Sequence, residues 1–501
     1  MNVIHRLENP QTPFLNVIFT FIGAITLRNY LEQFSTKIPI SVINDIHHSM
    51  AYISGALSLI ILFHFATREA VDKIARVILP CFIILPFVPL TDMLLSFGRG
   101  YSMFYLTPKM PHGIWGSLFF FFEPFREAGV TPGQQMEIVL VILMSGLYFF
   151  IKTDKLLRSV LFAGLTYILI FFYFALPFAL GAFLNVWGIP FFYSYKMMIQ
   201  VYLLLILPLI QGLFYLYNKQ YFTAIWKDSR LLRIVHFQLM VILGFVLTLD
   251  GSVKQSGIQL SWIFILPAII FGGLFSIIVN NCEDYDIDKI SNKSRPTISK
   301  TIPIEHYKSI SWIFFGLALI YASAVNFICF FIILLVIINY FLYSSPPFRF
   351  KRIPFFSKLV ISLNSLLLFG LGYSLPVGTV MPPIPGSIVL FFLVCFTAVI
   401  NFIDIKDYAG DKSAGIKTLP TLLGLKRAKL IIGLFFLITY SLTYFLVQDI
   451  RLLAVMITTG LFIFMLINRK DYSEKPVFIT YLFSIVFLIV CFFLKFHRFS
   501  F

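Results

Sequence analysis

The sequence predicts an all-α polytopic membrane protein, and three observations support this fold class. Hydrophobic residues make up 59% of the 501 residues and charged residues only 12%, a composition that excludes a soluble globular chain. Apolar runs of about 18 residues or more recur along the chain, each long enough to cross roughly 30 Å of hydrocarbon as a helix. The alternating ten-residue pattern typical of an outer-membrane barrel is missing from the sequence.

The N-terminal part is expected to contain about six membrane spans. They lie near 13–30, 49–66, 77–97, 136–151, 159–184 and 197–217. Between the third and fourth spans, the aromatic run 113–125 is too short to cross, so we expect it to lie in the interface or to re-enter the membrane. The first apolar stretch lacks a clear small-residue cleavage site, which favours a retained span over a signal peptide.

The C-terminal part is expected to contain nine further spans. They lie near 234–250, 259–279, 309–323, 325–342, 357–375, 386–403, 428–447, 452–468 and 477–495. The charged segment 218–233 separates the two helical sets and is the best domain boundary in the chain. We therefore predict an N-terminal transmembrane domain over 1–220 and a second domain over 230–501.

The formal net charge of +16 reports orientation and does not indicate a nucleic-acid partner. The basic residues are dispersed over inter-helix loops and form no continuous stripe. In the C-terminal part every second connection is rich in lysine and arginine, whereas the alternate connections hold only Lys254 and Arg451. The positive-inside rule then predicts an integral protein of the cell membrane whose basic loops, and the acidic clusters beside them, face the cytoplasm.

Two acidic clusters at the ends of apolar segments are the most informative local feature. Carboxylates are expensive at membrane depth unless a partner compensates them. Each cluster repeats its polar residues at helical spacing, so each would form one stripe on a helix. Two facing carboxylate stripes make an oxygen-ligand site for Mg²⁺, which substrate phosphates usually complete. The stripes consist of Asn280, Asp284 and Asp288 in the first cluster and of Asp404, Asp407 and Asp411 in the second.

Basic residues follow both stripes closely. Arg295, Lys351, Arg352 and Lys412 are candidates for binding phosphate oxygens, arginine through a bidentate fork and lysine as a point charge. Each residue also fits the positive-inside bias, so topology alone is an equally good explanation for any one of them. Lys351 and Arg352 are favoured because the segment 343–352, YSSPPFRFKR, couples a rigid Pro-Pro turn to its charges.

With these motifs in place, residues from about 230 to 501 resemble the UbiA superfamily of intramembrane prenyltransferases. The resemblance rests on NNCEDYDIDK, on the following SRP (294–296), on YSSPPFRFKR and on DIKDYAGDKSAGIKTLPTLLG (404–424). The family motifs N-(D/Q)-x-x-D-x-x-x-D and D-x-x-D-x-x-x-D are matched by the first and second stripes. Asn281 stands where many members carry Asp, and Ser299-Lys300 where a Ser-Gly pair is common. Residues 1–220 lie outside the resemblance.

The resemblance implies a bundle of nine helices and an ionisation mechanism with a polyprenyl diphosphate donor and a lipophilic acceptor. It implies that Mg²⁺ is held by Asp284, Asp288, Asp404 and Asp407, with Asn280 and Asp411 assisting. It implies that the diphosphate is bound by Asn280, Arg295, Lys351, Arg352 and Lys412. Asn364, Tyr343 and Tyr373 are weaker candidates for substrate contact. Protein partners are not indicated.

Two other functions stay open. A terpene cyclase or prenyl-diphosphate hydrolase would use the same site without a separate acceptor, and a membrane scaffold or transporter could retain a lipid-diphosphate site without catalysis. The N-terminal domain carries intramembrane polar residues of its own, among them His47, His48 and Asp92. Such residues are functional candidates, although a structural pair between Asp92 and Arg99 is equally consistent with the spacing. The sequence assigns this domain no reaction.

Overall fold

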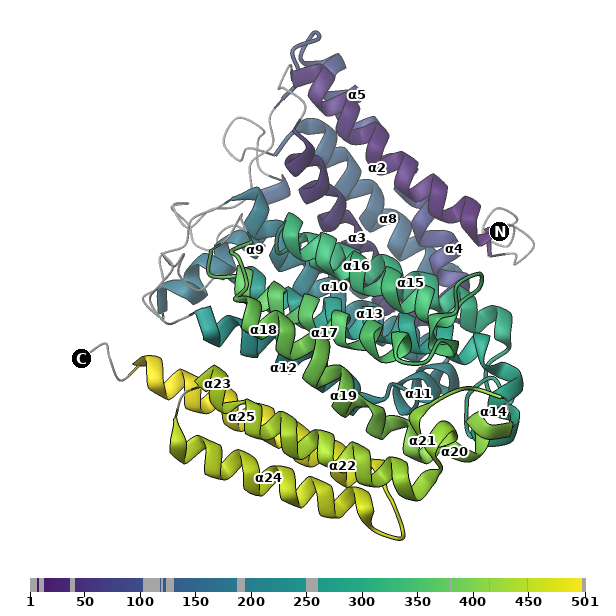
Figure 1. Cartoon of the computed structure of the whole chain (residues 1–501). Helices are drawn as coiled ribbons and strands as arrows, with labels where there is room; N and C mark the ends of the chain where they lie inside the picture. Colours follow the sequence, from purple (N-terminus) through teal and green to yellow (C-terminus); the bar gives the residue numbers. More distant parts are fainter. Residues whose placement is uncertain are drawn as a thin grey trace. The chain divides into compact units, whose positions relative to one another are not determined.

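The computed structural model shows a helical chain in two compact units, Met1–Lys219 (unit 1) and Gln220–Phe501 (unit 2) (Figure 1). The structure describes residues 7–8, 13–36, 41–101, 118, 120–122, 130–186, 194–248, 260–377, 381–413, 415–447 and 449–497. These residues form helices and turns and contain no strand. The all-α fold class is thus confirmed, while the use of the two units as functional domains stays a prediction. Most of the aromatic run 113–125 lies outside the described residues.

Each of the six predicted N-terminal spans coincides with helical structure in unit 1. The third span is the only one of the six that is broken: a 3-10 turn over Phe82–Ile84 separates its two helices. Pro80 and Pro86 flank this break and cannot donate backbone hydrogen bonds, which explains it. The helices are α2 (Phe14–Thr36), α3 (Val42–Thr67), α4 (Val71–Cys81), α5 (Phe87–Leu95), α8 (Pro132–Thr153), α9 (Leu156–Val186) and α10 (Tyr195–Tyr217).

The start of α8 is fixed by a buried acid. Thr131 forms a capping box with Gln134, and Asp92 Oδ1 accepts a hydrogen bond of 2.7 Å from the backbone N–H of Gly133. A Cβ on Gly133 would lie 2.3 Å from the carbonyl oxygen of Val88, so glycine permits the close approach of α5 and α8. Asp92 therefore has a structural role at a helix N-terminus, and the pairing with Arg99 considered from the spacing is not what the structure records.

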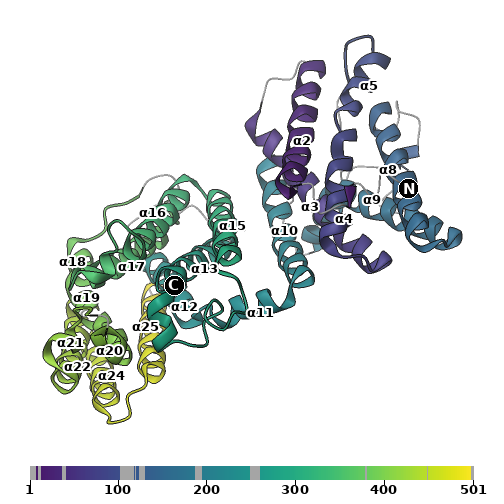
Figure 2. The ribbon, with the colours of Figure 1, turned by 90° about the vertical axis from the view of Figure 1, so that its right-hand side faces the viewer.

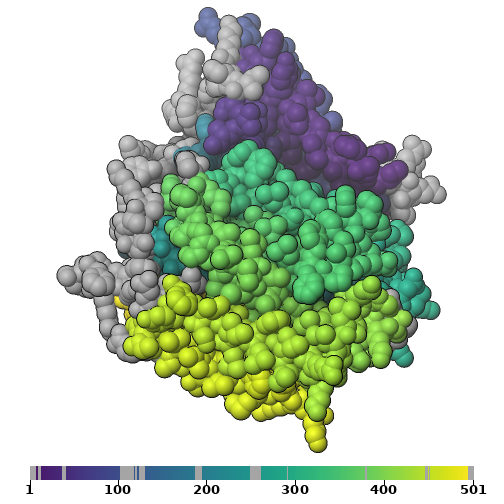
Figure 3. Space-filling view, in the orientation of Figure 1, coloured from purple at the N-terminus to yellow at the C-terminus, as the bar shows by residue number. Residues whose placement is uncertain are grey.

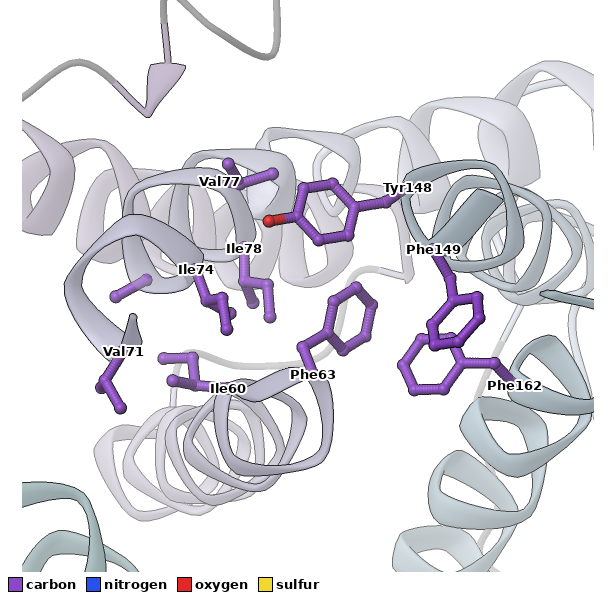
Figure 4. Close-up of a cluster of buried hydrophobic side chains, with 10 residues drawn as sticks. Ile60, Phe63, Val71, Ile74, Val77, Ile78, Tyr148, Phe149 and Phe162 are labelled. Atoms are coloured by element: carbon purple, nitrogen blue, oxygen red, sulfur yellow. The ribbon is translucent and has the colours of Figure 1, made fainter. Parts of the chain in front are cut away.

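An aromatic and aliphatic core joins α3, α4, α8 and α9 (Figure 4). The ring of Phe149 stacks on Phe162 with centroids 4.9 Å apart, and Phe63 meets Phe162 edge to face at 4.8 Å. Ile74 of α4 is fully buried against them. The geometry is the offset and T-shaped packing that aromatic quadrupoles favour. This cluster holds four of the unit's helices together.

Each of the nine predicted C-terminal spans also coincides with helical structure in the described part of unit 2. Over the described chain, eleven helices are long and apolar enough to cross a membrane, or twelve if the bent pair α11 and α12 forms one span. The helices are α11 (Lys219–Lys227), α12 (Leu231–Leu247), α13 (Ile265–Glu283), α14 (Tyr285–Ser291), α15 (Ile304–Ser323), α16 (Phe327–Ser344), α17 (Phe356–Ser374), α18 (Gly386–Leu390), α19 (Thr397–Val399), α20 (Asp404–Ser413), α21 (Leu419–Leu423), α22 (Leu425–Leu442), α23 (Tyr444–Val447), α24 (Ile450–Asn468) and α25 (Glu474–His497).

Contacts between these helices position the site. α12 packs against α17 and α25, and α22 packs against α24 (Figures 1 and 2). The layer of α22, α24 and α25, light green to yellow in Figure 3, carries exposed apolar side chains such as Phe483 of α25, at 69% exposure. Such a surface is what lipid contact requires. The short polar helices α14 and α20, which hold the two acidic clusters, contact each other (Figure 1).

Candidate active site

The first acidic cluster spans the junction between α13 and α14. Helix α13 ends at Glu283, and α14 starts at Tyr285. Helical hydrogen bonds nevertheless continue through the junction, because the N–H of Asp284 donates to Asn280 O at 2.9 Å and that of Asp288 donates to Asp284 O at 2.8 Å. The predicted stripe of Asn280, Asp284 and Asp288 is thus kept across a local break in the helix.

The loop between α16 and α17 brings positive charge onto Asp284. Lys351 Nζ lies 2.6 Å from Asp284 Oδ1, and Arg349 Nη2 lies 3.1 Å from the same oxygen. Lys351 also reaches Asn280 Oδ1 at 3.4 Å, and Ser344 Oγ donates to that oxygen at 3.2 Å. Burial lowers the pKa of Lys351, and the neighbouring Asp284 carboxylate opposes this shift. The amide and carboxylate of the first motif therefore share one lysine.

Asp288 has a different set of partners. Asn292 Nδ2 donates to Asp288 Oδ1 at 2.8 Å, and Arg295 Nε lies 3.6 Å from Asp288 Oδ2. Arg295 is also ion-paired with Asp228, in the segment between α11 and α12. Burial raises the pKa of Asp288, and its hydrogen bond with Asn292 opposes the rise. The predicted phosphate-binding Arg295 thus contacts the first motif directly.

Asn281, the departure from the family motif, occupies the centre of a buried hydrogen-bond network. Its Nδ2 donates to Asp228 Oδ2 at 2.5 Å, and its Oδ1 accepts from Arg230 Nη2 at 2.9 Å. Tyr307 Oη donates to the same Asp228 oxygen at 3.2 Å. An amide suits this position because it both donates and accepts, whereas an ionised Asp would place two carboxylates side by side. Asn281 therefore joins α13 to the α11–α12 turn.

The second cluster begins where α20 starts. Asp404 Oδ1 lies 2.5 Å from Lys358 Nζ, which comes from the first turn of α17, and both side chains are buried. The other carboxylate oxygen, Asp404 Oδ2, is buried and has no hydrogen-bond partner among the described residues. A buried oxygen without a partner is costly unless something else binds it. This atom is the clearest vacant acceptor in the cluster.

The two clusters face one another. Asp411 interacts electrostatically with Asp404 and Asp407 of its own cluster and with Asp284 of the first. Tyr343, at the end of α16, interacts electrostatically with both Asp284 and Asp404. Together with the contact between α14 and α20, these interactions place the carboxylates of both motifs around one region.

Two of the predicted phosphate-binding residues lie apart from this arrangement. Arg352 and Lys412 are both exposed. Lys412 Nζ stands 5.7 Å from the ring centroid of Tyr408 on its own helix. Their proposed roles stay predictions.

Several neighbouring charges were not singled out from the sequence. Arg349 lies inside the quoted YSSPPFRFKR segment, and Lys358 is a lysine at the start of an apolar helix, a signal that could have indicated it. Asp228 and Arg230 were assigned only to the domain boundary. No local pattern in the sequence connects them to Asn281, from which Asp228 is 53 residues distant.

The chemistry of the donor set suits Mg²⁺. The available ligands are carboxylate and amide oxygens, and Asp404 Oδ2 is free to bind. Within the described residues no group of three or more His, Cys, Asp or Glu side chains could by itself hold a metal ion. Mg²⁺ is usually bound through one or two carboxylates, waters and substrate phosphates.

Comparison with known proteins decides the family. Residues 237–494 match the model of the UbiA prenyltransferase family. The chain belongs to this family. The resemblance seen in the motifs is thereby confirmed, and the match lies within unit 2.

Among curated relatives, the digeranylgeranylglyceryl phosphate synthase of Sulfurisphaera tokodaii is 25% identical over 264 residues, which cover 50% of this chain and 88% of that protein. The homogentisate phytyltransferase of a Synechocystis species is 29% identical over 223 residues, covering 40% of this chain and 68% of that protein. Among solved structures, a UbiA homolog from Archaeoglobus fulgidus bound to GPP and Mg²⁺ aligns with 53% of this chain and 98% of its own, at 22% identity and a TM-score of 0.43.

Proposed function

We propose that unit 2 transfers a prenyl group from a polyprenyl diphosphate to a lipophilic acceptor in the membrane, with Mg²⁺, and releases pyrophosphate. One observation carries the proposal: Asp284 and Asp404 belong to two facing motifs, and each is ion-paired with a lysine, Lys351 and Lys358 respectively. Carboxylates for a divalent cation and cations for a diphosphate are thus interleaved in one region. Family membership supports the same chemistry.

The six motif side chains would hold the metal: Asn280, Asp284, Asp288, Asp404, Asp407 and Asp411. Bound Mg²⁺ would supply positive charge to the diphosphate oxygens as a Lewis acid. Lys351, Arg349 and Arg295 are positioned to donate to the diphosphate, as charge-assisted hydrogen bonds strengthen when charge develops on the leaving group. Their present carboxylate partners keep these cations in place before substrate binds.

The reaction breaks the bond between the first prenyl carbon and the diphosphate oxygen, and the electron pair leaves with pyrophosphate. The allylic cation then forms a new bond with the nucleophilic atom of the acceptor, which gives up a proton. The apolar helices around the site would exclude water, which would otherwise capture the cation. Loss of water exclusion would convert the transferase into a hydrolase.

Product analysis tests this proposal and separates it from the alternatives. The full chain in lipid nanodiscs is incubated with radiolabelled prenyl diphosphates, Mg²⁺ and a panel of glyceryl phosphate lipids and homogentisate, chosen from the names of the relatives. We expect a labelled, acceptor-dependent lipid product. Free prenyl alcohol in every reaction would indicate a hydrolase, and a cyclic hydrocarbon a cyclase. Unchanged diphosphate across the panel would favour a scaffold or transporter.

A further inference from the structure

Unit 1 contains a cavity that the proposed reaction does not use. Its volume is about 760 Å³, within the range of sites that hold one small organic molecule. Its walls come from α3, α4, α8, α9 and α10 and from the segment between α4 and α5, and all of its lining residues belong to unit 1. The cavity is therefore a property of this unit alone.

The cavity is long and runs beside α3 and α8. On α3 the lining extends from His48 to Phe63, and on α8 from Gln134 to Tyr148. At 1.5 Å per residue, these stretches rise roughly 21–23 Å. The two helices run in the same sense along it. Phe63 and Tyr148 meet at one end, with ring centroids 5.5 Å apart, and at the other end Arg28 contacts His48 and interacts electrostatically with Glu137. The shape suits an extended chain better than a compact ring system.

One end of the cavity is polar. His48, Tyr52 and Glu137 line it there. The Glu137 carboxylate has no hydrogen-bond partner recorded among the described residues, although it interacts electrostatically with Arg28. A carboxyl group beside an apolar cavity needs a hydrogen-bond donor, so the polar end favours a ligand that carries one.

Arg28 is buried behind this end, where it is ion-paired with Glu32, and its Nε has no hydrogen-bond partner among the described residues. Its Nη1 lies 2.5 Å from Glu32 Oε2, 3.1 Å from Asn29 Oδ1 and 3.0 Å from His48 Nδ1. Nη1 carries two N–H groups and faces three acceptors, so a hydrogen bond to His48 Nδ1 competes with those to Glu32 and Asn29. No lysine or arginine is found among the described lining residues. An anionic head group would therefore meet Glu137 without a compensating cation.

The opposite end of the cavity is apolar. Phe63, Val77, Ile78 and Tyr148 form its wall as part of the core cluster (Figure 4). On the way between the ends, Met144 and Leu147 of α8 line the cavity and are also 45% and 57% exposed. The cavity thus opens on an apolar side of α8, which gives a ligand dissolved in the membrane a way in.

We propose that this cavity binds one single-chain lipid with a neutral, hydrogen-bond-donating head group, a long-chain alcohol, whose hydroxyl donates to Glu137 and whose chain extends along α3 towards Phe63. The Glu137 carboxyl in the lining, and the absence of lysine and arginine from the described lining residues, disfavour a lipid phosphate or diphosphate. This inference does not depend on the proposed function of unit 2, since binding in unit 1 requires no catalysis.

Photolabelling of the full chain in nanodiscs tests the proposal. The probe is hexadecanol with a diazirine in its chain, compared with the same chain as a methyl ether and as a phosphate, and labelled peptides are identified by mass spectrometry. We expect the alcohol to label peptides of α3 and α8. Loss of a hydrogen bond to a charged group costs about 1.5–3 kcal/mol, so the ether should label these peptides about tenfold less or weaker still. Equal labelling by all three probes would overturn the proposal.

Two variants with a matched control locate the site. Gly55 lines the cavity, and a Cβ there meets no atom within 4 Å, so Gly55→Phe should fill the space and abolish labelling. Gly23 of α2 is equally free of neighbours and lies outside the cavity, so Gly23→Phe should leave labelling unchanged. Labelling that survives Gly55→Phe, or that falls equally in both, would contradict the assigned position.

The head-group contact has its own test, which does not depend on whether Gly55→Phe folds. Glu137→Gln keeps the side-chain volume and replaces a strong acceptor by a weaker one. We expect it to remove most of the preference for the alcohol over the ether while the ether still labels α8. An unchanged preference would show that Glu137 does not recognise the hydroxyl. Labelling should also persist in Asp284→Ala, which separates this site from the reaction proposed for unit 2.

Discussion

At the scale of single residues, the buried pair of Asp404 and Lys358 best illustrates how charge is tolerated in this protein. The two side chains come from α20 and α17 and are 46 residues apart in the sequence. Taking one ion out of water costs several kcal/mol, and its partner offsets this cost only when the geometry is good. The 2.5 Å contact provides that geometry. We expect that removing either charge alone would destabilise the folded protein.

Lys358→Met should therefore destabilise the protein by about 3–5 kcal/mol, because it leaves Asp404 buried without a counter-charge. The double variant Lys358→Met with Asp404→Asn should regain most of this loss, since it removes both charges. The free energy of unfolding of each variant, measured by titration with a denaturing detergent, checks the prediction. Lys412→Met is the control, because Lys412 is exposed. A Lys358→Met protein as stable as the control would contradict the account.

The sequence predicted the carboxylates of the site but not most of their partners. Spacing is local information, so the stripes of Asn280, Asp284 and Asp288 and of Asp404, Asp407 and Asp411 could be recognised. Ion pairs join distant segments, so Asp228 and Lys358 could not be assigned from spacing. Asn281 stands where many family members carry Asp, and its hydrogen bonds to Asp228 and Arg230 could not be read from that difference.

At the scale of elements, the contact between α12 and α17 depends on two glycines. A Cβ on Gly244 would lie 2.0 Å from the carbonyl oxygen of Phe369, and one on Gly372 would lie 1.8 Å from that of Val241. Small residues are the usual means by which membrane helices approach this closely. Because α17 also carries Lys358, this contact helps to position the site.

Gly244→Ala should lower the free energy of unfolding by about 1–3 kcal/mol, the usual range for overpacking. The same change at Gly316 of α15 is the matched control, since a Cβ there meets nothing within 4 Å. It should be neutral or stabilise the protein by about 0.5–1 kcal/mol through helix propensity. Detergent titration of the two variants side by side gives the comparison. Equal stabilities would mean that the helices do not approach as closely as described.

Element boundaries were predictable only in outline. Apolar length located helices at all the predicted span positions, including α15 and α22, whose first turns are polar or basic. It could not show that proline breaks the span of α4 and α5, or that residues Phe391–Phe396 form a π-helical stretch before α20. These local deviations follow from hydrogen bonding and packing with neighbours, which periodicity does not record.

At the scale of the whole molecule, the sequence predicted six spans followed by nine, and helices occur at all fifteen positions in the described residues. The cavity of unit 1 was beyond prediction, because its walls come from five helices and no motif connects them. The orientation in the membrane stays a prediction. It rests on the asymmetric distribution of lysine and arginine between alternate connections.

Cysteine labelling checks this orientation. Lys293→Cys and Lys470→Cys lie in basic connections, whereas Ser323→Cys and Met381→Cys lie in the alternate ones, and all four positions are exposed. A membrane-impermeant maleimide added to intact cells should label the second pair and reach the first only after lysis. The wild-type chain gives the background from its own free cysteines. The reverse pattern would place the acidic motifs outside the cell.

The central claim is that Asp284 and Asp404 serve one Mg²⁺-dependent reaction, and pyrophosphate release tests it most directly. Asp284→Asn and Asp404→Asn are compared with Asp286→Asn, whose side chain is 90% exposed and ion-paired with Lys289. We predict that the wild type and Asp286→Asn release pyrophosphate from a prenyl diphosphate in the presence of Mg²⁺. This release should stop when EDTA removes the Mg²⁺. Both other variants should lose about 100-fold or more of this rate, a loss of about 2.7 kcal/mol in transition-state stabilisation. Release that persists in either variant, or in EDTA, would contradict the account.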